Sequence, residues 1–208
     1  MASITDTGFH LEIPMAEPWP DGLCPQQMSW GCVYNSRAFT STLSNAQQIV
    51  SYPGAYWTCS MSFSALTRTQ ERLLTSLIGR LQGMAGTIQV PATTRQRADN
   101  IGAPVLAAAA STNAYSLSVS GLTANGIVFR AGDYITLEGV MFEVVADATA
   151  MGGAAVVTVN KRVRAGIPAG TAIEYQVPWC EMRLTGDVFS VDLQPLTCSA
   201  TIELREAF

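Results

Sequence analysis

The sequence predicts a mainly β fold with one α-helix, in which a split β-sandwich domain is interrupted by a small antiparallel β-barrel. Short runs of alternating apolar and polar residues recur between glycine- and proline-containing turns, which is typical of strands. One segment, about Thr67–Leu81, instead repeats leucine and isoleucine at helical spacing. Strand patterns like those in the first third of the chain recur at its end, which predicts that one β-domain is formed from two separate segments of the sequence.

Residues 1–27 are predicted to form an extended arm. Four of the ten prolines lie here, and proline fixes φ and removes a backbone donor, which excludes a central strand or a long helix. Before the prolines begin, apolar residues alternate as they do in a strand. We therefore expect the arm to pack on a neighbouring subunit or along its own body, with candidate contacts at Phe9, Leu11, Ile13 and Trp19.

Residues 28–91 are predicted to contain four strands and the helix. The strands are expected at Trp30–Phe39, Gln47–Val50, Tyr56–Phe63 and Thr87–Val90. In the first of these, we expect three side chains to point inward, namely Val33, Ala38 and Phe39. The third alternates strictly, which predicts one buried face formed by Trp57, Cys59, Met61 and Phe63.

The helix is the clearest local signal in the chain. Thr67 followed by Gln70 fits a capping box, in which each side chain satisfies a free amide at the helix start. Gly83 follows the last apolar residue and is predicted to end the helix. A helix this short is marginal alone, so its apolar face is expected to pack on the sheet through Leu73, Leu74, Leu77, Ile78 and Leu81.

The remainder of the chain is divided by composition. Residues 92–114 are predicted to be a connector, because polar residues are followed by an alanine run with no polar face. Residues 115–178 read as short strands between glycine turns, typical of a small barrel or sandwich. The predicted parts are therefore an arm (1–27), a β-domain with the helix (28–100 and 179–208) and an inserted β-barrel domain (101–178).

Composition favours a subunit of an assembly. Hydrophobic residues make up 48% of the chain and charged residues only 13%, roughly half of the usual charged share, which favours surface covered by partners. The net charge of −4 argues against a nucleic-acid-binding surface. No apolar run approaches the length that spans a bilayer, and the first residues lack the features of a signal peptide, so we expect synthesis and folding in the cytoplasm.

The sequence contains no recognisable catalytic constellation. None of the five cysteines has the C-x-x-C spacing of a zinc or redox site, and buried thiols are favoured over a metal cluster. The only histidine, His10, lies in the arm. Two carboxylate pairs leave a glycosidase formally open, although turn and edge positions are commoner for such residues: Asp133 with Glu138, and Asp187 with Asp192. We expect no enzyme activity, no cofactor and no metal.

Several motifs together resemble distal tail proteins of long-tailed bacteriophages. They are Pro53-Gly54-Ala55-Tyr56-Trp57 ahead of the helix, the helix ending Gly79-Arg80-Leu81-Gln82-Gly83, and the later Phe129-Arg130-Ala131-Gly132-Asp133-Tyr134. The resemblance covers about residues 28–205. It implies a hexameric ring between the tail tube and the baseplate hub, built from a belt β-sandwich with a helix. A second domain, galectin-like or OB-like, projects outward and in some members binds host saccharide.

The resemblance also implies partners and a location. The expected partners are further copies of the chain, the tail tube protein and the hub or tip protein, with DNA only passing through the lumen and no membrane. The expected location is the virion. Candidate contacts in the loop between the first two strands are Leu43, Gln47 and Gln48. The alternative function is a saccharide-binding module or adaptor for host-surface attachment, for which the inserted domain offers Tyr115, Tyr134 and Tyr175.

Overall fold

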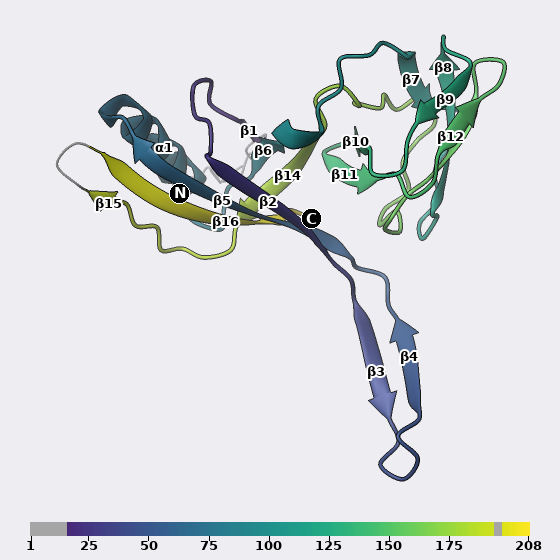
Figure 1. Ribbon diagram of the computed structural model, residues 1–208, viewed down its shortest axis with the longest axis horizontal. Coiled ribbons are helices and arrows are strands. Elements are labelled where there is room, and N and C mark those ends of the chain that lie inside the picture. Colours follow the sequence, from purple (N-terminus) through teal and green to yellow (C-terminus); the bar gives the residue numbers. More distant parts are fainter. Residues whose placement is uncertain (1–15, 194–196) are drawn as a thin grey trace, which may run out of the picture.

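A mixed seven-stranded sheet with one helix against it forms the body of the chain (Figure 1). The computed structural model describes residues 16–193 and 197–208. The strand order is β1-β6-β14-β16-β5-β2, with β15 paired to β16. The bounds are β1 Glu17–Pro18, β2 Gln27–Val33, β5 Tyr56–Leu66, β6 Ile88–Pro91, β14 Trp179–Leu184, β15 Asp192–Leu193 and β16 Cys198–Glu206.

The sheet is assembled from both ends of the sequence. The strands β14 and β16 lie between β6 and β5, so the last thirty or so residues fill the centre of a sheet that the first ninety begin. The pairing is antiparallel throughout except for β1, which lies parallel to β6. The division of the chain into the three predicted domains stays a prediction.

The helix α1 (Arg68–Leu81) has the predicted capping box. The Gln70 amide donates to Thr67 Oγ1 at 3.3 Å, and the Thr67 amide donates to Gln70 Oε1 at 3.0 Å. The helix ends at Gln82, which takes the left-handed conformation at φ 50°, one residue before the predicted Gly83. Leu74, Leu77 and Leu81 are buried against the sheet, whereas Leu73 is exposed because it lies at the border of the apolar stripe.

The strand β5 supplies the other half of this core. Its predicted inward residues, Trp57, Cys59, Met61 and Phe63, are all buried, and they share one hydrophobic core with the three buried helix leucines. Full burial of one such side chain contributes about 1.5–3 kcal/mol. The prediction of strict alternation in this strand is confirmed.

Residues 101–178 form a second unit with its own core, built from three small sheets. The sheets are β13-β8-β7, β12-β9 and β10-β11. Among the described residues, none of these sheets closes into a barrel, so the predicted barrel is not seen. The strands are short, and register shifts interrupt the β7–β8 and β9–β12 ladders. Their bounds are β7 Gly102–Leu106, β8 Ser116–Leu122, β9 Gly126–Phe129, β10 Tyr134–Leu137, β11 Val140–Glu143, β12 Ala148–Ala150 and β13 Ala155–Thr158.

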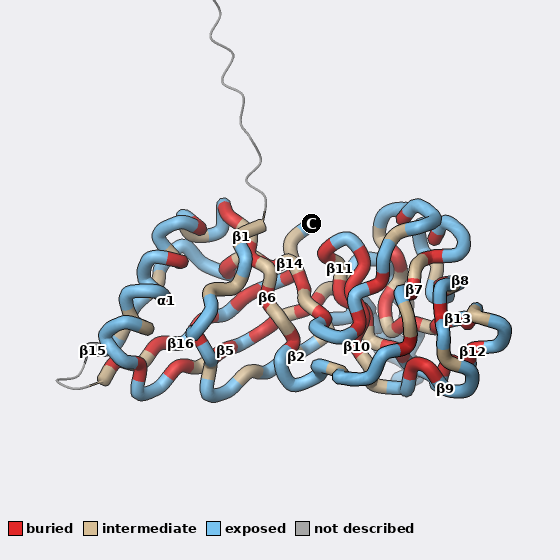
Figure 2. Tube along the Cα trace, turned by 90° about the horizontal axis from the view of Figure 1, so that it is seen from above, coloured by how far each residue is buried: buried red, intermediate tan, exposed pale blue. Residues whose placement is uncertain are grey.

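The predicted connector is partly ordered. Residues 93–95 form a 3₁₀ helix, η1 (Thr93–Arg95), and Val105 and Leu106 belong to β7. Leu106 is buried in the second core, which explains why the end of this segment pairs as a strand. Figure 2 shows buried positions in both halves of the molecule.

The two cores meet at a buried junction. Tyr134 and Met141 of the second unit belong to the first core, and the Trp57 indole donates to the Met141 carbonyl at 2.7 Å. Beside them, Lys161 forms an ion pair with Glu206, and both side chains are almost completely buried. The Glu206 carboxylate also accepts the Trp57 amide at 2.8 Å. The second unit is therefore anchored to β5 and β16 through a buried polar contact.

The first prediction concerns this ion pair. Replacing Lys161 with methionine should lower the free energy of unfolding by about 3–5 kcal/mol, because Glu206 would be buried without its partner charge. The matched control is Lys161→Met combined with Glu206→Gln, which keeps an acceptor for the Trp57 amide and buries no charge. Urea unfolding should find the double variant clearly more stable than the single one, and equal stabilities would contradict the assignment.

The second prediction concerns the thiols. Burial raises the pKa of the Cys59 thiol from 9.0 to about 12. The folded chain then holds this proton more tightly than the unfolded chain, so the stabilisation is complete below pH 9 and is lost as the pH rises toward 12.

Thiol labelling at neutral pH offers a direct check. The exposed Cys24 should react fast, the half-buried Cys32 more slowly, and Cys59, Cys180 and Cys198 only on unfolding. A Cys24→Ser variant should lose the fast phase alone. Equal rates at all five thiols would disprove the burial.

Candidate functional site: a projecting hairpin

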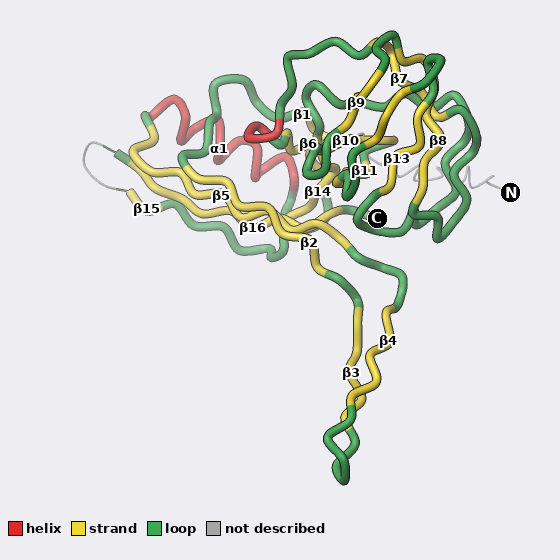
Figure 3. Tube along the Cα trace, turned by 45° about the vertical axis from the view of Figure 1, so that its right-hand side comes forward, coloured by secondary structure: helices red, strands yellow, loops and turns green. Residues whose placement is uncertain are grey.

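A β-hairpin projects from the body of the chain (Figures 1 and 3). Its strands are β3 (Ser36–Thr40) and β4 (Gln47–Ser51), paired antiparallel from Ser36 opposite Ser51 to Thr40 opposite Gln47. The loop is closed by hydrogen bonds from the Ser41 amide to the Ala46 carbonyl at 2.9 Å and from the Asn45 amide to the Ser41 carbonyl at 3.0 Å. The hairpin extends the β2–β5 pair beyond the rest of the sheet.

This arrangement corrects the predicted strand Trp30–Phe39. The strand β2 ends at Val33, and β3 begins only at Ser36. At the interruption, the Tyr52 amide donates to the Asn35 carbonyl at 2.7 Å, and the Asn35 side chain donates to the Pro53 carbonyl at 3.2 Å. The predicted inward positions Val33, Ala38 and Phe39 are all exposed, because no described part of the chain forms a second layer over the ribbon beyond residue 33.

The hairpin presents large apolar side chains to its surroundings. Phe39 is 55% exposed, Ile49 68% and Leu43, in the loop, 98%. Directly paired residues point to the same side, so Phe39 lies on one face of the ribbon with Gln48, and Ile49 lies on the other with Ala38. Both faces are therefore apolar in part, and neither is covered by any described residue of the body.

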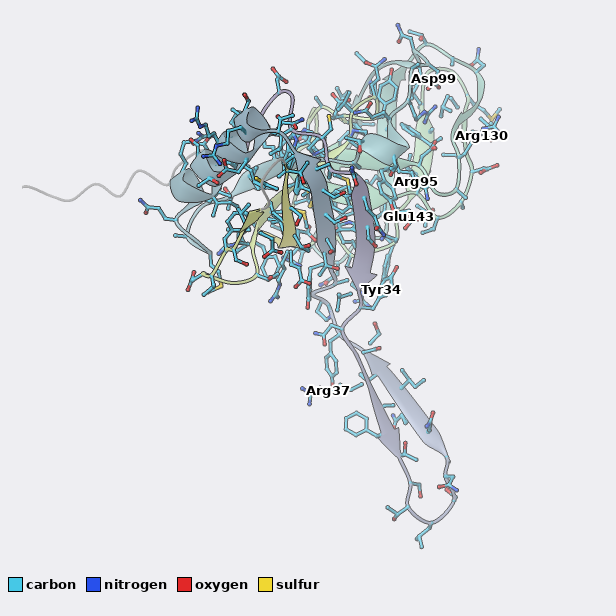
Figure 4. The ribbon with its side chains drawn as sticks, turned by 60° about the vertical axis from the view of Figure 1, so that its left-hand side comes forward. Tyr34, Arg37, Arg95, Asp99, Arg130 and Glu143 are labelled. Atoms are coloured by element: carbon cyan, nitrogen blue, oxygen red, sulfur yellow. The ribbon has the colours of Figure 1, made fainter. Side chains whose placement is uncertain are left out.

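The hairpin also carries very little charge. Among residues 34–55, Arg37 is the only charged side chain. Figure 4 labels Arg37 and Tyr34 and shows side chains standing out on both sides of the ribbon. An exposed edge strand is commonly protected from association by lysine, proline or a bulge, and β3 and β4 contain no lysine, no proline and no register shift. The outer backbone edges of β3 and β4 pair with no other described strand.

The root of the hairpin lies beside the second unit, although most of its residues remain exposed. Tyr34, Asn35 and residues 51–55 line a cavity of about 20 Å³ together with Tyr115 and residues 160–162. Burial raises the pKa of the Cys32 thiol and that of the Tyr34 hydroxyl. Both groups therefore stay uncharged at neutral pH, in keeping with a structural role at this position.

The face of the sheet away from α1, here called the open face, is most exposed along β2 and β16, whereas Glu181 and Arg183 on β14 are half-buried. In β2, β5 and β16 the outward positions are aligned by register, since Ser29 lies opposite Ser60 and Ser60 opposite Glu203. This face is rich in hydroxyl groups and carries two acidic and two basic side chains on β14 and β16. Its members are Ser29, Thr58, Ser60, Ser62, Glu181, Arg183, Thr201, Glu203 and Arg205.

The predicted contact residues fall into two groups. Leu43, Gln47 and Gln48 are exposed and lie together on the hairpin. Trp19 is partly buried on its own chain, where its indole donates to the Leu23 carbonyl at 2.8 Å and its ring packs on the first core. Phe9, Leu11 and Ile13 lie outside the described residues.

Two hairpin residues, Phe39 and Ile49, were not predicted as contacts. The signal in the sequence that points to them is a strand-like segment, residues 34–55, in which apolar residues are mixed with uncharged polar residues and almost no charge is present. From the sequence alone, an apolar residue in such a segment is equally compatible with a position in the hydrophobic core.

One carboxylate of each candidate catalytic pair has structural partners. Asp133 accepts hydrogen bonds from Arg97 at 2.7 Å and from the Arg130 amide at 2.8 Å, while Asp187 accepts the Met84 amide at 3.1 Å. Within residues 16–193 and 197–208, no group of three or more His, Cys, Asp or Glu side chains could hold a metal ion. His10 lies outside this part of the chain.

The aromatic residues considered for saccharide binding are mostly in the core. Tyr134 and Tyr175 are buried, and the Tyr175 hydroxyl accepts the Ile101 amide at 3.1 Å. Tyr115 is partly exposed, but Arg162 lies over its ring at 5.3 Å and donates to its hydroxyl. No exposed pair of aromatic rings is found among these three residues.

Comparison with known proteins gives no match, either to a protein-family model or to a curated protein sequence. No helix in the described part of the chain is both long enough and apolar enough to cross a membrane.

The third prediction follows from the lack of contacts between the hairpin and the core. Replacing residues 36–51 with a two-residue Asn-Gly turn should change the free energy of unfolding by less than about 1 kcal/mol, because no buried side chain is removed. The matched control, Leu77→Ala in the core, should cost about 2–5 kcal/mol. Thermal and urea unfolding would measure both, and a loss from the deletion as large as that from Leu77→Ala would contradict this account.

Proposed function

We propose that the chain is a structural ring protein of a phage tail tip, which joins the tail tube to the baseplate hub. The observation that carries the proposal is the projecting hairpin, with apolar residues on both faces and outer backbone edges that pair with no other described strand. The resemblance to distal tail proteins adds the place of the ring and its hexameric order. Its proposed location is the virion.

The physical reason is that the hairpin leaves apolar side chains and backbone hydrogen-bonding groups without partners among the described residues. A two-stranded ribbon with no covering layer is marginally stable in water, and association would bury Phe39, Leu43 and Ile49. A neighbouring copy can pair with a free strand edge and cover one face at the same time. Because the hairpin reaches away from its own body, the contact joins two different surfaces, and such heterologous contacts close into rings by rotation.

The open face of the sheet suits the lining of a channel. Its hydroxyl groups and its balanced pairs, Glu181 with Arg183 and Glu203 with Arg205, give it little net charge. DNA binds strongly to surfaces where many cations neutralise its phosphates, so a balanced face would let it pass. We assign this face to the lumen of the proposed ring.

The finer architecture is part of the same proposal. Residues 28–100 and 179–208 would form the belt, and residues 101–178 the peripheral domain. The arm, residues 1–27, would add contacts, although its described part from residue 16 onward lies along its own body through the β1–β6 pair and Trp19. The alternative, a saccharide-binding module, has less support because two of its three candidate tyrosines are buried.

The fourth prediction tests assembly through the hairpin. The purified chain should form closed particles of several copies, and Phe39→Asp with Ile49→Asp should reduce them to single chains, because two buried charges would then oppose the contact. The matched control is Ile127→Asp with Val156→Asp, on the second unit, where the native residues are 53% and 61% exposed. Mass photometry measures the copy number, and averaged electron micrographs give the symmetry.

Two outcomes would contradict the proposal. One is a wild-type chain that stays single in solution and is absent from phage particles. The other is a hairpin variant that assembles as well as the control. If particles form with a symmetry other than six, ring formation stands and the resemblance-based copy number is wrong.

A further inference from the structure

The return strand of the hairpin is held by a side chain from the second unit. Arg164 donates from Nη2 to the carbonyl of Ala55 at 2.9 Å, at the point where the hairpin rejoins β5. The guanidinium of the same residue stacks on Phe208, with its central carbon 3.5 Å from the ring centre. One side chain thus contacts both the root of the hairpin and the segment after β16.

The partners of Arg164 are themselves fixed. Phe208 lies 6.4 Å from the Tyr56 ring, and Arg205 stacks on Tyr56 at 4.1 Å and on Phe208 at 5.3 Å. Alternating rings and guanidinium groups of this kind attract one another and restrict side-chain motion. The cluster therefore forms a firm base beside the hairpin root.

The segment that carries Arg164 is also anchored. Three residues earlier, Lys161 forms the buried ion pair with Glu206, whose carboxylate accepts the Trp57 amide. Arg164 itself forms no ion pair among the described residues. Its guanidinium instead donates a hydrogen bond to the Ala55 carbonyl and stacks with its flat face on the Phe208 ring. Planar guanidinium is well suited to combine a carbonyl contact with ring stacking.

Few contacts fix the direction of the hairpin, and all of them lie at its root. The ladder between β2–β5 and β3–β4 is interrupted at residues 34–35 and 52–55, where a ribbon bends most easily. The hydrogen bonds at Asn35 join the two strands of the hairpin to each other and not to the body. Two polar contacts tie this junction to the second unit: one joins the side chains of Tyr34 and Asn160, and the other is the hydrogen bond from Arg164 to the Ala55 carbonyl on the return strand.

We infer that Arg164 is the positioning residue that sets the direction in which the hairpin leaves the body. It thereby couples the second unit to the hairpin, so that a displacement of the second unit moves the ribbon. The consequence for assembly rests on the proposed function, whereas the coupling itself does not. A subunit would then present its hairpin at one fixed angle, which a ring of defined copy number requires.

The fifth prediction uses amide hydrogen exchange to test the coupling. Every chain carries Phe39→Asp and Ile49→Asp, so that exchange is measured on single chains whether or not the wild type assembles. Arg164→Ala should increase exchange in residues 47–57 by about tenfold, because a hydrogen bond from a charged donor is lost. Arg164→Lys should give a smaller increase in the same segment, since lysine can still donate but cannot stack in the same way.

A matched control separates this effect from loss of charge. Arg130→Ala removes an exposed arginine of the second unit, which Figure 4 labels at a distance from the hairpin, and should leave exchange in residues 47–57 unchanged. Unchanged exchange in both Arg164 variants would overturn the inference. So would an increase spread evenly over the hairpin, β5 and α1, which would indicate general destabilisation. A confirmed local effect, together with a wild-type chain that stays single in the fourth experiment, would support the coupling and refute the ring.

Discussion

The buried contact of Lys161 with Glu206 is the constraint on which the relation of the two units depends. Lys161 lies in the second unit and Glu206 at the end of β16 in the main sheet, and both side chains are almost completely buried. Burial lowers the pKa of Lys161, while the neighbouring Glu206 carboxylate opposes this shift. Such a pair is poor at adding stability but effective at rejecting alternatives, because any other docking of the units would leave a charge unpaired. The Trp57 amide extends the same constraint to β5, from which the hairpin continues.

Local signals in the sequence predicted local structure well. The capping box at Thr67 and the alternation from Trp57 to Phe63 depend on neighbours in the chain, and both appear in the structure as predicted. Barrel closure depends on register between distant strands, which turn residues do not encode. The glycines at 139, 152 and 153 do adopt positive φ, yet the strands they join remain in separate small sheets.

The candidate site shows the same limit more sharply. The sequence identifies Leu43 in the hairpin loop and Gln47 and Gln48 at the start of β4 as candidate contacts, whereas it places Phe39 in the interior. Hydrophobic alternation indicates which face of a strand is expected to be buried. It does not indicate whether the surface that covers this face belongs to the same chain or to another one. Trp19 illustrates the opposite case, since an aromatic residue in a proline-rich arm is used by its own core.

The single charge between residues 34 and 55 has a consequence for how the chain must be produced. A ribbon without gatekeeper lysines has no electrostatic means of refusing an unsuitable strand, and added salt would not weaken such pairing. Discrimination between a correct and an incorrect pairing strand must then come from the shapes of the two surfaces and from the order in which they meet. In the proposed ring, copies made in excess of their binding sites would pair with one another through the same strand edges, so the amount of chain produced would have to match the number of sites.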